Sequence, residues 1–264
     1  MIDTGRIVAV TGASSGIGLA AARLFRDRGD KVYCLSRTDP KEPGITFIHT
    51  DVTDEASVNA AFGAIGKAEG RIDVLLSNAG MGVSGAAECT TMQDAKRQFD
   101  VNFFGLHACV RAAVPLMRAH GGTILATSSV AAVFAIPFQA FYSASKFAVN
   151  ALVLALANEL KPFNIRVAEI MPGDVKTGFT GARVKAARDD NYGQSVEKSV
   201  AVMERDEQNG MGPELIAKKF VALSLKKHPK VLSTVGLQYK FFCFLGKVLP
   251  IRLQNFIVGK MYIK

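Results

Sequence analysis

Cysteine is scarce in this sequence of 264 residues, and its four cysteines are scattered along the chain. They are Cys34, Cys89, Cys109 and Cys243, and no two have the short spacing of a pair of metal ligands. Nothing in their arrangement indicates a framework of disulfides. We therefore expect no metal site, and we expect a reducing, cytoplasmic environment.

Two kinds of hydrophobic segment are also missing. The N-terminus, MIDTGRIVAV, lacks the charged start and long apolar stretch of a signal peptide, and we expect none. No stretch of about 20 residues is both apolar and free of charge, so we expect no transmembrane helix. The composition, which is 49% apolar, is that of one globular domain with a large core.

Acidic residues are almost absent from the C-terminal part. Residues 214–264 contain ten Lys and Arg against one acidic residue, Glu214, whereas residues 1–213 contain 22 of each sign. The net charge of +9 therefore belongs to this segment and not to the rest of the chain, which is neutral. We expect no nucleic-acid partner. A basic segment of this kind either contacts an acidic surface or forms a solvated helix face.

Strand-like and helix-like segments alternate through most of the sequence. The strand-like runs are RIVAV, KVYCL, ITFIHT, DVLLSN, TILATSS and RVAEIM, and the helix-like ones are residues 16–28, 57–69, 93–119 and 140–160. Such alternation predicts parallel β-α-β units, and nearly apolar strands indicate a sheet covered on both faces. The predicted fold class is α/β: a doubly wound parallel sheet of about seven strands with helices on both sides. The helix at 140–160 is so rich in apolar residues that we expect it to be well buried.

Two segments fall outside this alternation. Residues 174–212 are polar and charged, and we expect a lid-like insert over a site. Residues 231–264 form an apolar, aromatic and basic extension, which Gly246 and Pro250 divide into two short helices.

A glycine-rich turn follows the first strand. The segment TGASSGIG, residues 11–18, has the spacing G-x-x-x-G-x-G and runs directly into a helix. Glycine permits a tight turn and a close approach of a ligand, and the helix start offers unpaired N–H groups to a phosphate. Strand, turn and helix together predict a dinucleotide site, and the turn lacks the Gly-Lys-Ser/Thr ending of a P-loop.

The end of the second strand bears on the choice of cofactor. Dinucleotide-binding folds often have an acidic residue here that binds the adenosine ribose, whereas this chain has Ser36 and Arg37. An arginine binds a ribose phosphate through a charge-assisted pair, and a carboxylate repels it. The pattern favours NADP over NAD, and the alternative is that Arg37 is a solvent-facing loop residue.

Tyr142 and Lys146 lie four positions apart near the start of the helix at 140–160. This spacing places them on one helix face. A neighbouring ammonium favours the phenolate, and we therefore expect it to lower the tyrosine pKa from about 10 toward a range useful for proton transfer. Taken alone, the pair is more typical of a tyrosine at a helix start and a surface lysine, and it is the combination with Ser129 and the glycine-rich turn that favours the catalytic interpretation.

These motifs together resemble the classical short-chain dehydrogenase/reductase family. The matching segments, in the family's order, are TGASSGIG (11–18), SNAG (77–80), Asn102, Ser129, YSASK (142–146) and PGDVKT (172–177). Ser129 precedes Tyr142 by 13 positions, the family's usual spacing. The resemblance implies one NAD(P)-binding Rossmann-fold domain over residues 1–264, and the long C-terminal part is loosely similar to hydroxysteroid and retinol dehydrogenases.

The resemblance also implies roles for individual residues. Tyr142 is the expected general acid and base, Ser129 binds the substrate oxygen, Lys146 binds the nicotinamide ribose, and Asn102 holds a water near the lysine. The positions that match the family's cofactor contacts are Gly12, Ser14, Ser15, Gly16, Ile17, Gly18, Arg37, Asp51, Val52, Asn78, Ala79, Gly80, Tyr142, Lys146, Pro172, Gly173, Val175 and Thr177.

The expected function is that of an NADP(H)-dependent oxidoreductase. Hydride passes between nicotinamide and a ketone, an aldehyde or a secondary alcohol, and the aromatic extension indicates a bulky, apolar steroid-, retinoid- or lipid-like substrate. The alternative is a cofactor-sensing regulatory protein on the same fold, although such relatives usually lose the tyrosine or the lysine. We expect a homodimer or homotetramer, with the extension serving as pocket wall, subunit contact or peripheral membrane contact.

Overall fold

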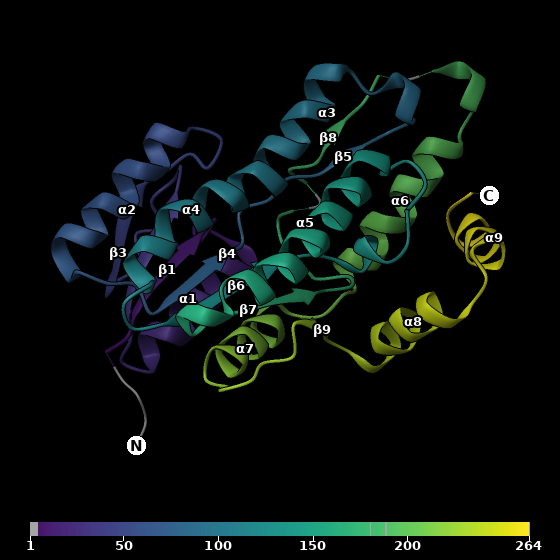
Figure 1. Ribbon diagram of the computed structural model, residues 1–264. Coiled ribbons are helices and arrows are strands. Elements are labelled where there is room, and N and C mark those ends of the chain that lie inside the picture. The colour runs from purple at the N-terminus through teal and green to yellow at the C-terminus, as the bar shows by residue number, and fades with distance from the viewer. Residues whose placement is uncertain (1–4, 180, 188, 264) are drawn as a thin grey trace.

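Seven parallel strands form the centre of the computed structural model, which describes residues 5–179, 181–187 and 189–263. In chain order they are β1 (Ile7–Thr11), β2 (Lys31–Ser36), β3 (Ile45–His49), β4 (Val74–Ser77), β6 (Gly122–Thr127), β7 (Ile165–Met171) and β9 (Leu232–Thr234). Their order across the sheet is β3-β2-β1-β4-β6-β7-β9 (Figure 1). The doubly wound sheet predicted from the sequence is confirmed.

Helices cover both faces of this sheet. On one face lie α2 (Glu55–Glu69), α4 (Gly105–Met117) and α5 (Ala140–Glu159), and on the other lie α1 (Gly16–Asp27) and α7 (Pro213–Ser224). Phe62 and Val149 belong to the first apolar layer, and Phe25 and Phe220 to the second. Because both faces are covered, the five residues of β1 are all buried, which explains its uninterrupted apolar sequence.

The strand order reverses direction between β1 and β4. In open α/β sheets such a reversal leaves a crevice beyond the carboxyl ends of the strands, because the connecting helices leave on opposite faces. The glycine-rich turn follows β1, and the SNAG segment ends β4. The topology therefore brings these two motifs to the same place.

Helix α5 is less buried than the sequence predicts. Val149, Val153 and Leu156 pack on the sheet, but Phe147 and Leu154 on the outer side are 44% and 46% exposed. The expectation of a well-buried helix is wrong, because no element of the described chain covers that side. Among the described helices, α5 alone is long and apolar enough to cross a membrane. In this structure it packs against the sheet instead.

Short elements complete the chain. They are β5 (Val83–Ser84) paired in parallel with β8 (Val184–Lys185), η1 (Ala87–Cys89), α3 (Met92–Phe99), η2 (Asp100–Phe104), η3 (Val130–Ala132), η4 (Lys161–Phe163), η5 (Asp190–Tyr192) and α6 (Ser195–Gln208). The insert expected at 174–212 thus contains a short strand and a helix. Residues 180 and 188 of this insert and residue 264 of the extension lie outside the described residues.

The C-terminal extension forms two helices, as expected. Helix α8 spans Leu237–Val248 and α9 spans Ile251–Tyr262. Pro250 separates them, whereas Gly246 stays inside α8 and interrupts nothing. Since β9 belongs to the main sheet, the part outside the sheet begins at Gly236 and not at residue 231. In Figure 1 the pair of helices leaves the sheet edge after β9, and α9 lies next to α6.

Candidate active site

The turn between β1 and α1 is shaped for close approach of a ligand. Gly12 and Gly16 adopt left-handed backbone angles, with φ of 62° and 54°. A Cβ on Gly18 would lie 2.4 Å from the carbonyl oxygen of Gly12, so only glycine fits there. The N-cap residue Ser15 makes no side-chain capping bond within the described part of the chain. The first N–H groups of α1 therefore suit a phosphate group.

Asn78 holds this turn in place. Its amide nitrogen donates to the carbonyl oxygens of Thr11 and Gly12, both at 3.3 Å. Its amide oxygen accepts a 3.0 Å hydrogen bond from the hydroxyl of Thr127. Asn78 thus ties the ends of β1, β4 and β6 together, a supporting role that its position in SNAG alone does not reveal.

Polar groups at the end of β2 and after β3 line one end of the cleft. Ser36 is buried and donates to the carbonyl oxygen of Thr38 at 2.7 Å, which leaves Arg37 exposed at the cleft. Burial on its own raises the pKa of Asp51, but hydrogen bonds from Thr53 and the charge of Arg37 outweigh burial, and the pKa is lowered. An ionised carboxylate therefore lines this cleft together with a cation.

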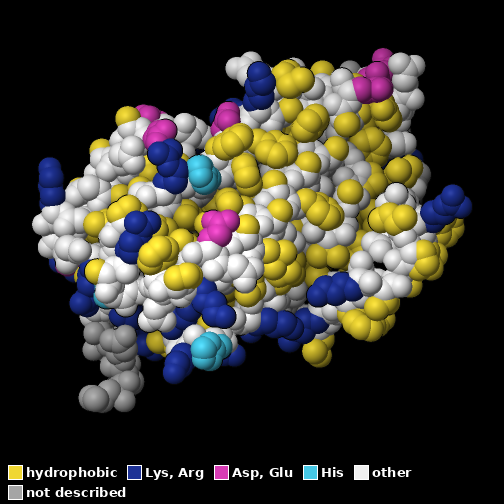
Figure 2. Space-filling view, viewed as in Figure 1, with side chains coloured by type: hydrophobic (Ala, Val, Ile, Leu, Met, Phe, Trp, Pro, Cys, Tyr) yellow, Lys and Arg dark blue, Asp and Glu magenta, His cyan; other side chains and the backbone are white. Residues whose placement is uncertain are grey.

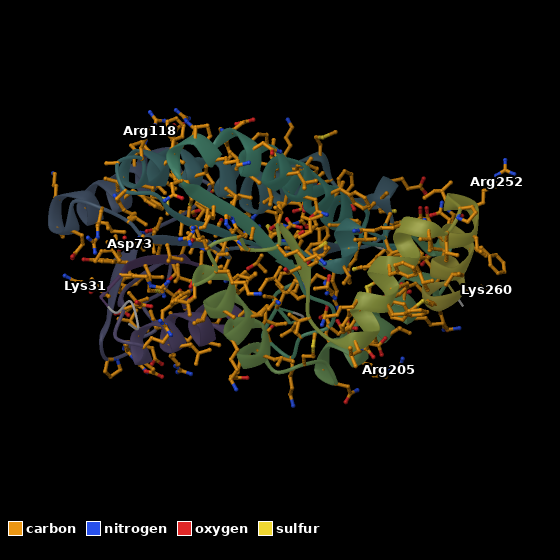
Figure 3. The ribbon with its side chains drawn as sticks, turned by 60° about the horizontal axis from the view of Figure 1, so that its bottom comes forward. Lys31, Asp73, Arg118, Arg205, Arg252 and Lys260 are labelled. Carbon is orange, nitrogen blue, oxygen red and sulfur yellow. The ribbon has the colours of Figure 1, made fainter. Side chains whose placement is uncertain are left out.

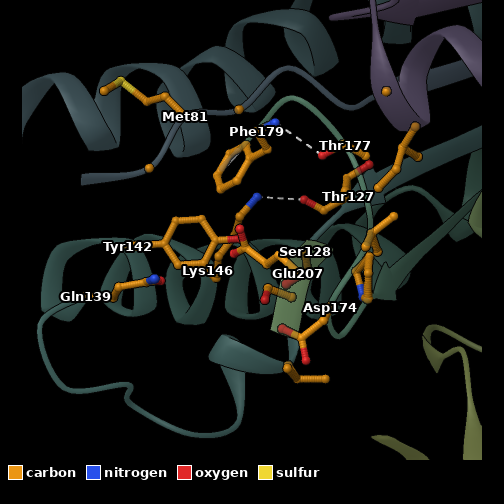
Figure 4. Close-up of a pocket in the computed structure, with 18 of the residues that line it drawn as sticks. Met81, Thr127, Ser128, Gln139, Tyr142, Lys146, Asp174, Thr177, Phe179 and Glu207 are labelled. Carbon is orange, nitrogen blue, oxygen red and sulfur yellow. Dashed lines mark hydrogen bonds between the residues drawn. The ribbon is translucent and has the colours of Figure 1, made fainter. Parts of the chain in front are cut away.

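Tyr142 and Lys146 lie next to each other in the cleft (Figure 4). Ser129 lines the same cleft. The hydroxyl of Ser129 is close enough to the Tyr142 phenol to act on its pKa, which it lowers. The ammonium of Lys146 lies 5.7 Å from the centre of the Tyr142 ring and donates to the carbonyl oxygen of Thr127 at 2.8 Å. The sequence motif YSASK and the serine 13 positions before it are thus brought together as predicted.

The pKa of Tyr142 differs from the expectation. Burial raises it, and the charge of Glu207 adds to this, while Ser129 and Arg183 act in the opposite direction. The expected lowering of this pKa is wrong for this structure, because burial outweighs the groups that lower it. Burial also lowers the pKa of Lys146 to about 8, against the opposing effect of the charge of Glu169.

Asn102 sits in η2, a π-helical turn between α3 and α4. Its amide nitrogen donates to the hydroxyl of Ser145 at 3.0 Å, and its amide oxygen accepts from the backbone N–H of Met81 at 2.9 Å. The side chain therefore joins the loop after β4 to the start of α5. Turns of this kind often occur at functional sites.

The segment after β7 closes the cleft on its other side. A Cβ on Gly173 would lie 2.0 Å from the ring of Tyr239 in α8. Only glycine at this position therefore lets the ring pack against the backbone. Val175 forms a β-bridge with Met211. Thr177 approaches the glycine-rich turn: a Cβ on Gly16 would meet its side chain at 3.4 Å. These residues lie where the resemblance implies cofactor contacts.

Two lining residues, Phe179 and Glu207, and the buried Arg183 that contacts both were not predicted from the sequence. The ring of Phe179 lies 5.9 Å from that of Tyr142, and Arg183 stacks on Phe179 while it pairs with Glu207. All three belong to the insert, which the sequence marked only as a polar segment. Arg183 and Glu207 are 24 positions apart, and a salt bridge at that separation leaves no periodic pattern in the sequence. The polar composition of the insert was the only sequence feature that pointed to this region.

The whole cleft has a volume of about 1180 Å³ and is continuous from Arg37 to the C-terminal helices. Sites for one small ligand usually measure about 300–1,000 Å³, so this one has room for two molecules side by side. Its far end is lined by apolar side chains of α8 and α9. These are Tyr239, Phe242, Leu245, Leu249, Ile257, Val258, Met261 and Tyr262.

One group of metal-ligand types lies outside this cleft. Ligand atoms of Glu88, Cys89 and Asp189 lie within 4.8 Å of one another near the surface. Burial and the two carboxylates raise the pKa of the Cys89 thiol. A metal ion would have to displace the thiol proton before the sulfur could bind it.

Comparison with known proteins identifies the family of this chain. The sequence model for short chain dehydrogenases matches residues 6–188, well over half of the chain. The chain belongs to the short-chain dehydrogenase family. It is 39% identical to the 3-ketodihydrosphingosine reductase of Bacteroides thetaiotaomicron over 236 residues, which cover 88% of each protein.

Solved structures agree with this assignment. A short-chain dehydrogenase from Streptomyces avermitilis, 27% identical, matches with a TM-score of 0.84 over 98% of this chain and 97% of its own. An alcohol dehydrogenase from Thermococcus sibiricus in complex with 5-hydroxy-NADP is 25% identical, with a TM-score of 0.72 over 87% of this chain and 95% of its own. Short-chain dehydrogenases are oxidoreductases that use a nicotinamide cofactor on small molecules, and the glycine cradle described above fits such a dinucleotide.

Proposed function

We propose that this short-chain dehydrogenase uses NADP(H) to interconvert a bulky, apolar ketone and the corresponding secondary alcohol. The observation that carries the proposal is the continuity of the cleft. One cavity joins the glycine-rich turn, the Tyr142 phenol and the apolar wall of α8 and α9. A dinucleotide in the turn and an apolar substrate against the wall would meet at Tyr142.

The preference for NADP rests on Arg37. Its exposed guanidinium stands at the end of β2, and Ser14 lines the same end of the cleft. Both suit a ribose 2′-phosphate, which an arginine binds through charge-assisted hydrogen bonds. The carboxylate of Asp51 is held by two hydrogen bonds from Thr53, at 2.9 and 2.8 Å, and is available to the adenosine end in a fixed orientation.

When bound, the nicotinamide supplies or accepts the hydride. In the direction of reduction, Tyr142 donates its phenolic proton to the carbonyl oxygen, and Ser129 donates a hydrogen bond to the same oxygen as negative charge develops there. The raised pKa of Tyr142 keeps the phenol protonated near neutral pH, which favours reduction. Lys146, which donates to the carbonyl oxygen of Thr127, would supply a cation to the ribose of a bound cofactor. Asn102 holds the loop of Met81 against the start of α5.

The substrate class rests on the far end of the cleft. Apolar side chains from α8 and α9 line it, and each buried apolar group contributes about 25 cal/mol per Å² to the binding of an apolar chain. The relative from Bacteroides thetaiotaomicron is named for a long-chain amino ketone, 3-ketodihydrosphingosine. We therefore place a lipid-derived ketone first among the candidate substrates.

A comparison of carbonyl compounds tests the proposal. NADPH and NADH oxidation is followed with 3-ketodihydrosphingosine, a steroid ketone and 2-butanone at equal concentrations. We expect the largest kcat/KM with a bulky ketone and with NADPH. A preference for NADH refutes the cofactor assignment. Tight cofactor binding without turnover of any carbonyl supports the alternative, a cofactor-sensing protein.

A homo-oligomer remains our proposal for the assembly. Phe104, Phe147 and Leu154 on η2 and α5 expose apolar surface on the side of α5 that faces away from the sheet. Figure 2 shows apolar side chains gathered over this part of the molecule. A second copy packed here would remove that surface from water. Sedimentation analysis of a Phe147→Glu variant tests this: we expect loss of the oligomer, and an unchanged mass refutes it.

A further inference from the structure

Helices α8 and α9, here called the C-terminal hairpin (residues 237–262), have two different faces. Tyr239, Cys243 and Val258 are buried against the rest of the protein. Tyr239 also donates a 2.7 Å hydrogen bond from its hydroxyl to the carboxylate of Asp174, which fixes α8 beside the cleft. The inner face is therefore a defined wall of the site.

The outer face is apolar and exposed. Eleven of the eighteen large hydrophobic side chains exposed in the described residues lie between positions 237 and 263. Three of them, Phe242, Ile257 and Met261, also line the cleft. The other eight form the outer face: Leu237, Phe241, Phe244, Val248, Ile251, Leu253, Phe256 and Ile263. Single exposed apolar residues are ordinary, but a cluster of this size in one segment marks an interaction surface.

The charges on the hairpin are all of one sign. Lys240, Lys247, Arg252 and Lys260 are exposed. Residues 215–263 contain nine Lys and Arg and no acidic residue. Figure 3 shows Arg252 and Lys260 pointing away from the protein at the outer end of the hairpin. The surface that covers this face must therefore tolerate apolar contact and carry negative charge.

We propose that the outer face of the C-terminal hairpin docks on an anionic lipid bilayer. Helices with aromatic and aliphatic side chains on one side and Lys or Arg around them lie in the interface between headgroups and acyl chains. Anionic headgroups attract the four cations, while the phenylalanines enter the acyl region. The hairpin then lies between the membrane and the apolar end of the cleft.

A second copy of the chain fits this face less well. A two-fold contact places the same patch of both subunits together. Four cations would then face four cations with no carboxylate of the hairpin to compensate them. The apolar surface around Phe147 on α5 is a separate region and does not carry this excess of positive charge.

Flotation with lipid vesicles tests the proposal on the full chain. The vesicles are phosphatidylcholine alone, or a 7:3 mixture of phosphatidylcholine and phosphatidylglycerol. We expect binding to the anionic vesicles, little binding to the neutral ones, and release by 0.5 M NaCl. The assay needs neither cofactor nor ketone, so its outcome is independent of the proposed activity. Failure to bind anionic vesicles refutes the proposal.

Two variants and a control make the test specific. Arg252→Gln with Lys260→Gln should weaken binding roughly 10- to 30-fold, since each basic residue near such a surface contributes a factor of about 5. Phe241→Ser with Phe244→Ser should abolish it; these side chains are 57% and 58% exposed and do not line the cleft. Lys67→Gln with Lys161→Gln removes two distant exposed charges and should leave binding within about threefold of wild type.

Melting curves of each variant confirm that it is folded. Equal losses in the Arg252/Lys260 and Lys67/Lys161 variants would mean that net charge alone drives binding, and the proposal would fail. A second copy as the occupant predicts a different result. The Phe241/Phe244 variant would then sediment with a smaller mass than the wild type and would show no change in vesicle binding.

Discussion

Glu169 and Lys146 are two buried ionisable residues behind the active site, and each affects the pKa of the other. Glu169 lies in β7 with no exposed surface, and Lys146 lies on α5. Burial raises the pKa of Glu169 to about 8 and lowers that of Lys146 to about 8, and the charge of each opposes the effect of burial on the other. With its amide turned to satisfy its neighbours, Asn150 donates to a carboxylate oxygen of Glu169 at 3.1 Å and to the Ser128 hydroxyl at 2.9 Å.

This pair predicts the effect of Glu169→Gln on the pH profile. Near pH 8 the Glu169 carboxyl is partly ionised, and its negative charge favours the charged form of Lys146. The substitution removes that charge, so the pKa of the lysine should fall further. If turnover needs charged Lys146, the alkaline limb of kcat/KM for reduction moves to lower pH. A full pH profile of both proteins checks this. An alkaline limb at the wild-type position contradicts the coupling.

Cofactor choice should depend on Arg37. Arg37→Asp replaces attraction to a 2′-phosphate with repulsion, and we expect the ratio of kcat/KM with NADPH to that with NADH to fall roughly 100-fold, or about 2.7 kcal/mol. Lys41→Asp makes the same charge change four positions further on, at a residue that does not line the cleft. It should change the ratio by less than about threefold. Equal effects of the two substitutions would mean that the overall electrostatic potential of the protein, and not a contact of Arg37, selects the cofactor.

Gly18→Ala should disturb the nucleotide turn. The added Cβ would lie 2.4 Å from the carbonyl oxygen of Gly12 and 2.5 Å from the amide nitrogen of Asn78, so the turn must move. We expect a lower melting temperature and at least a tenfold weaker affinity for NADPH. Gly63→Ala is the matched control, since its Cβ meets nothing within 4 Å on helix α2. That variant should be more stable by about 0.5–1 kcal/mol, because alanine is the better helix former.

Tyr239→Phe should loosen the C-terminal hairpin. The change removes the hydroxyl that donates to Asp174, a carboxyl whose pKa burial already raises. Loss of a buried donor of this kind costs about 1–3 kcal/mol of unfolding free energy. We also expect a larger loss of kcat/KM with a long-chain ketone than with 2-butanone. Tyr192→Phe removes an exposed hydrogen bond to Glu88 and serves as control, with an expected change below about 0.5 kcal/mol.

Local sequence patterns predicted much of this molecule. Strands covered on both faces are nearly apolar, and a tight turn before a helix needs glycine, so β1, Gly12 and α1 are visible in the sequence. The spacing of Tyr142 and Lys146 likewise predicted one helix face. In each case the signal lies within a few neighbouring residues.

Features that depend on distant contacts were missed. Glu169 stands in an apolar strand, and nothing nearby in the sequence shows that Lys146 lies near it. The pKa of Tyr142 is raised and not lowered, because burial by surrounding elements and the charge of Glu207 on α6 both raise it. The exposure of Phe147 was missed for the opposite reason: composition reports how apolar a helix is, and not whether a neighbour covers it.

The most direct test of the proposed function is the reduction rate of the Tyr142→Phe variant with saturating NADPH and the best bulky ketone. The phenol proton is lost while the ring remains, so NADPH affinity and melting temperature should stay close to wild type. General acid catalysis typically contributes about 10²–10⁴-fold, and we expect kcat to fall by this factor. A variant that reduces the ketone at nearly the wild-type rate would contradict the assignment of Tyr142 as the proton donor.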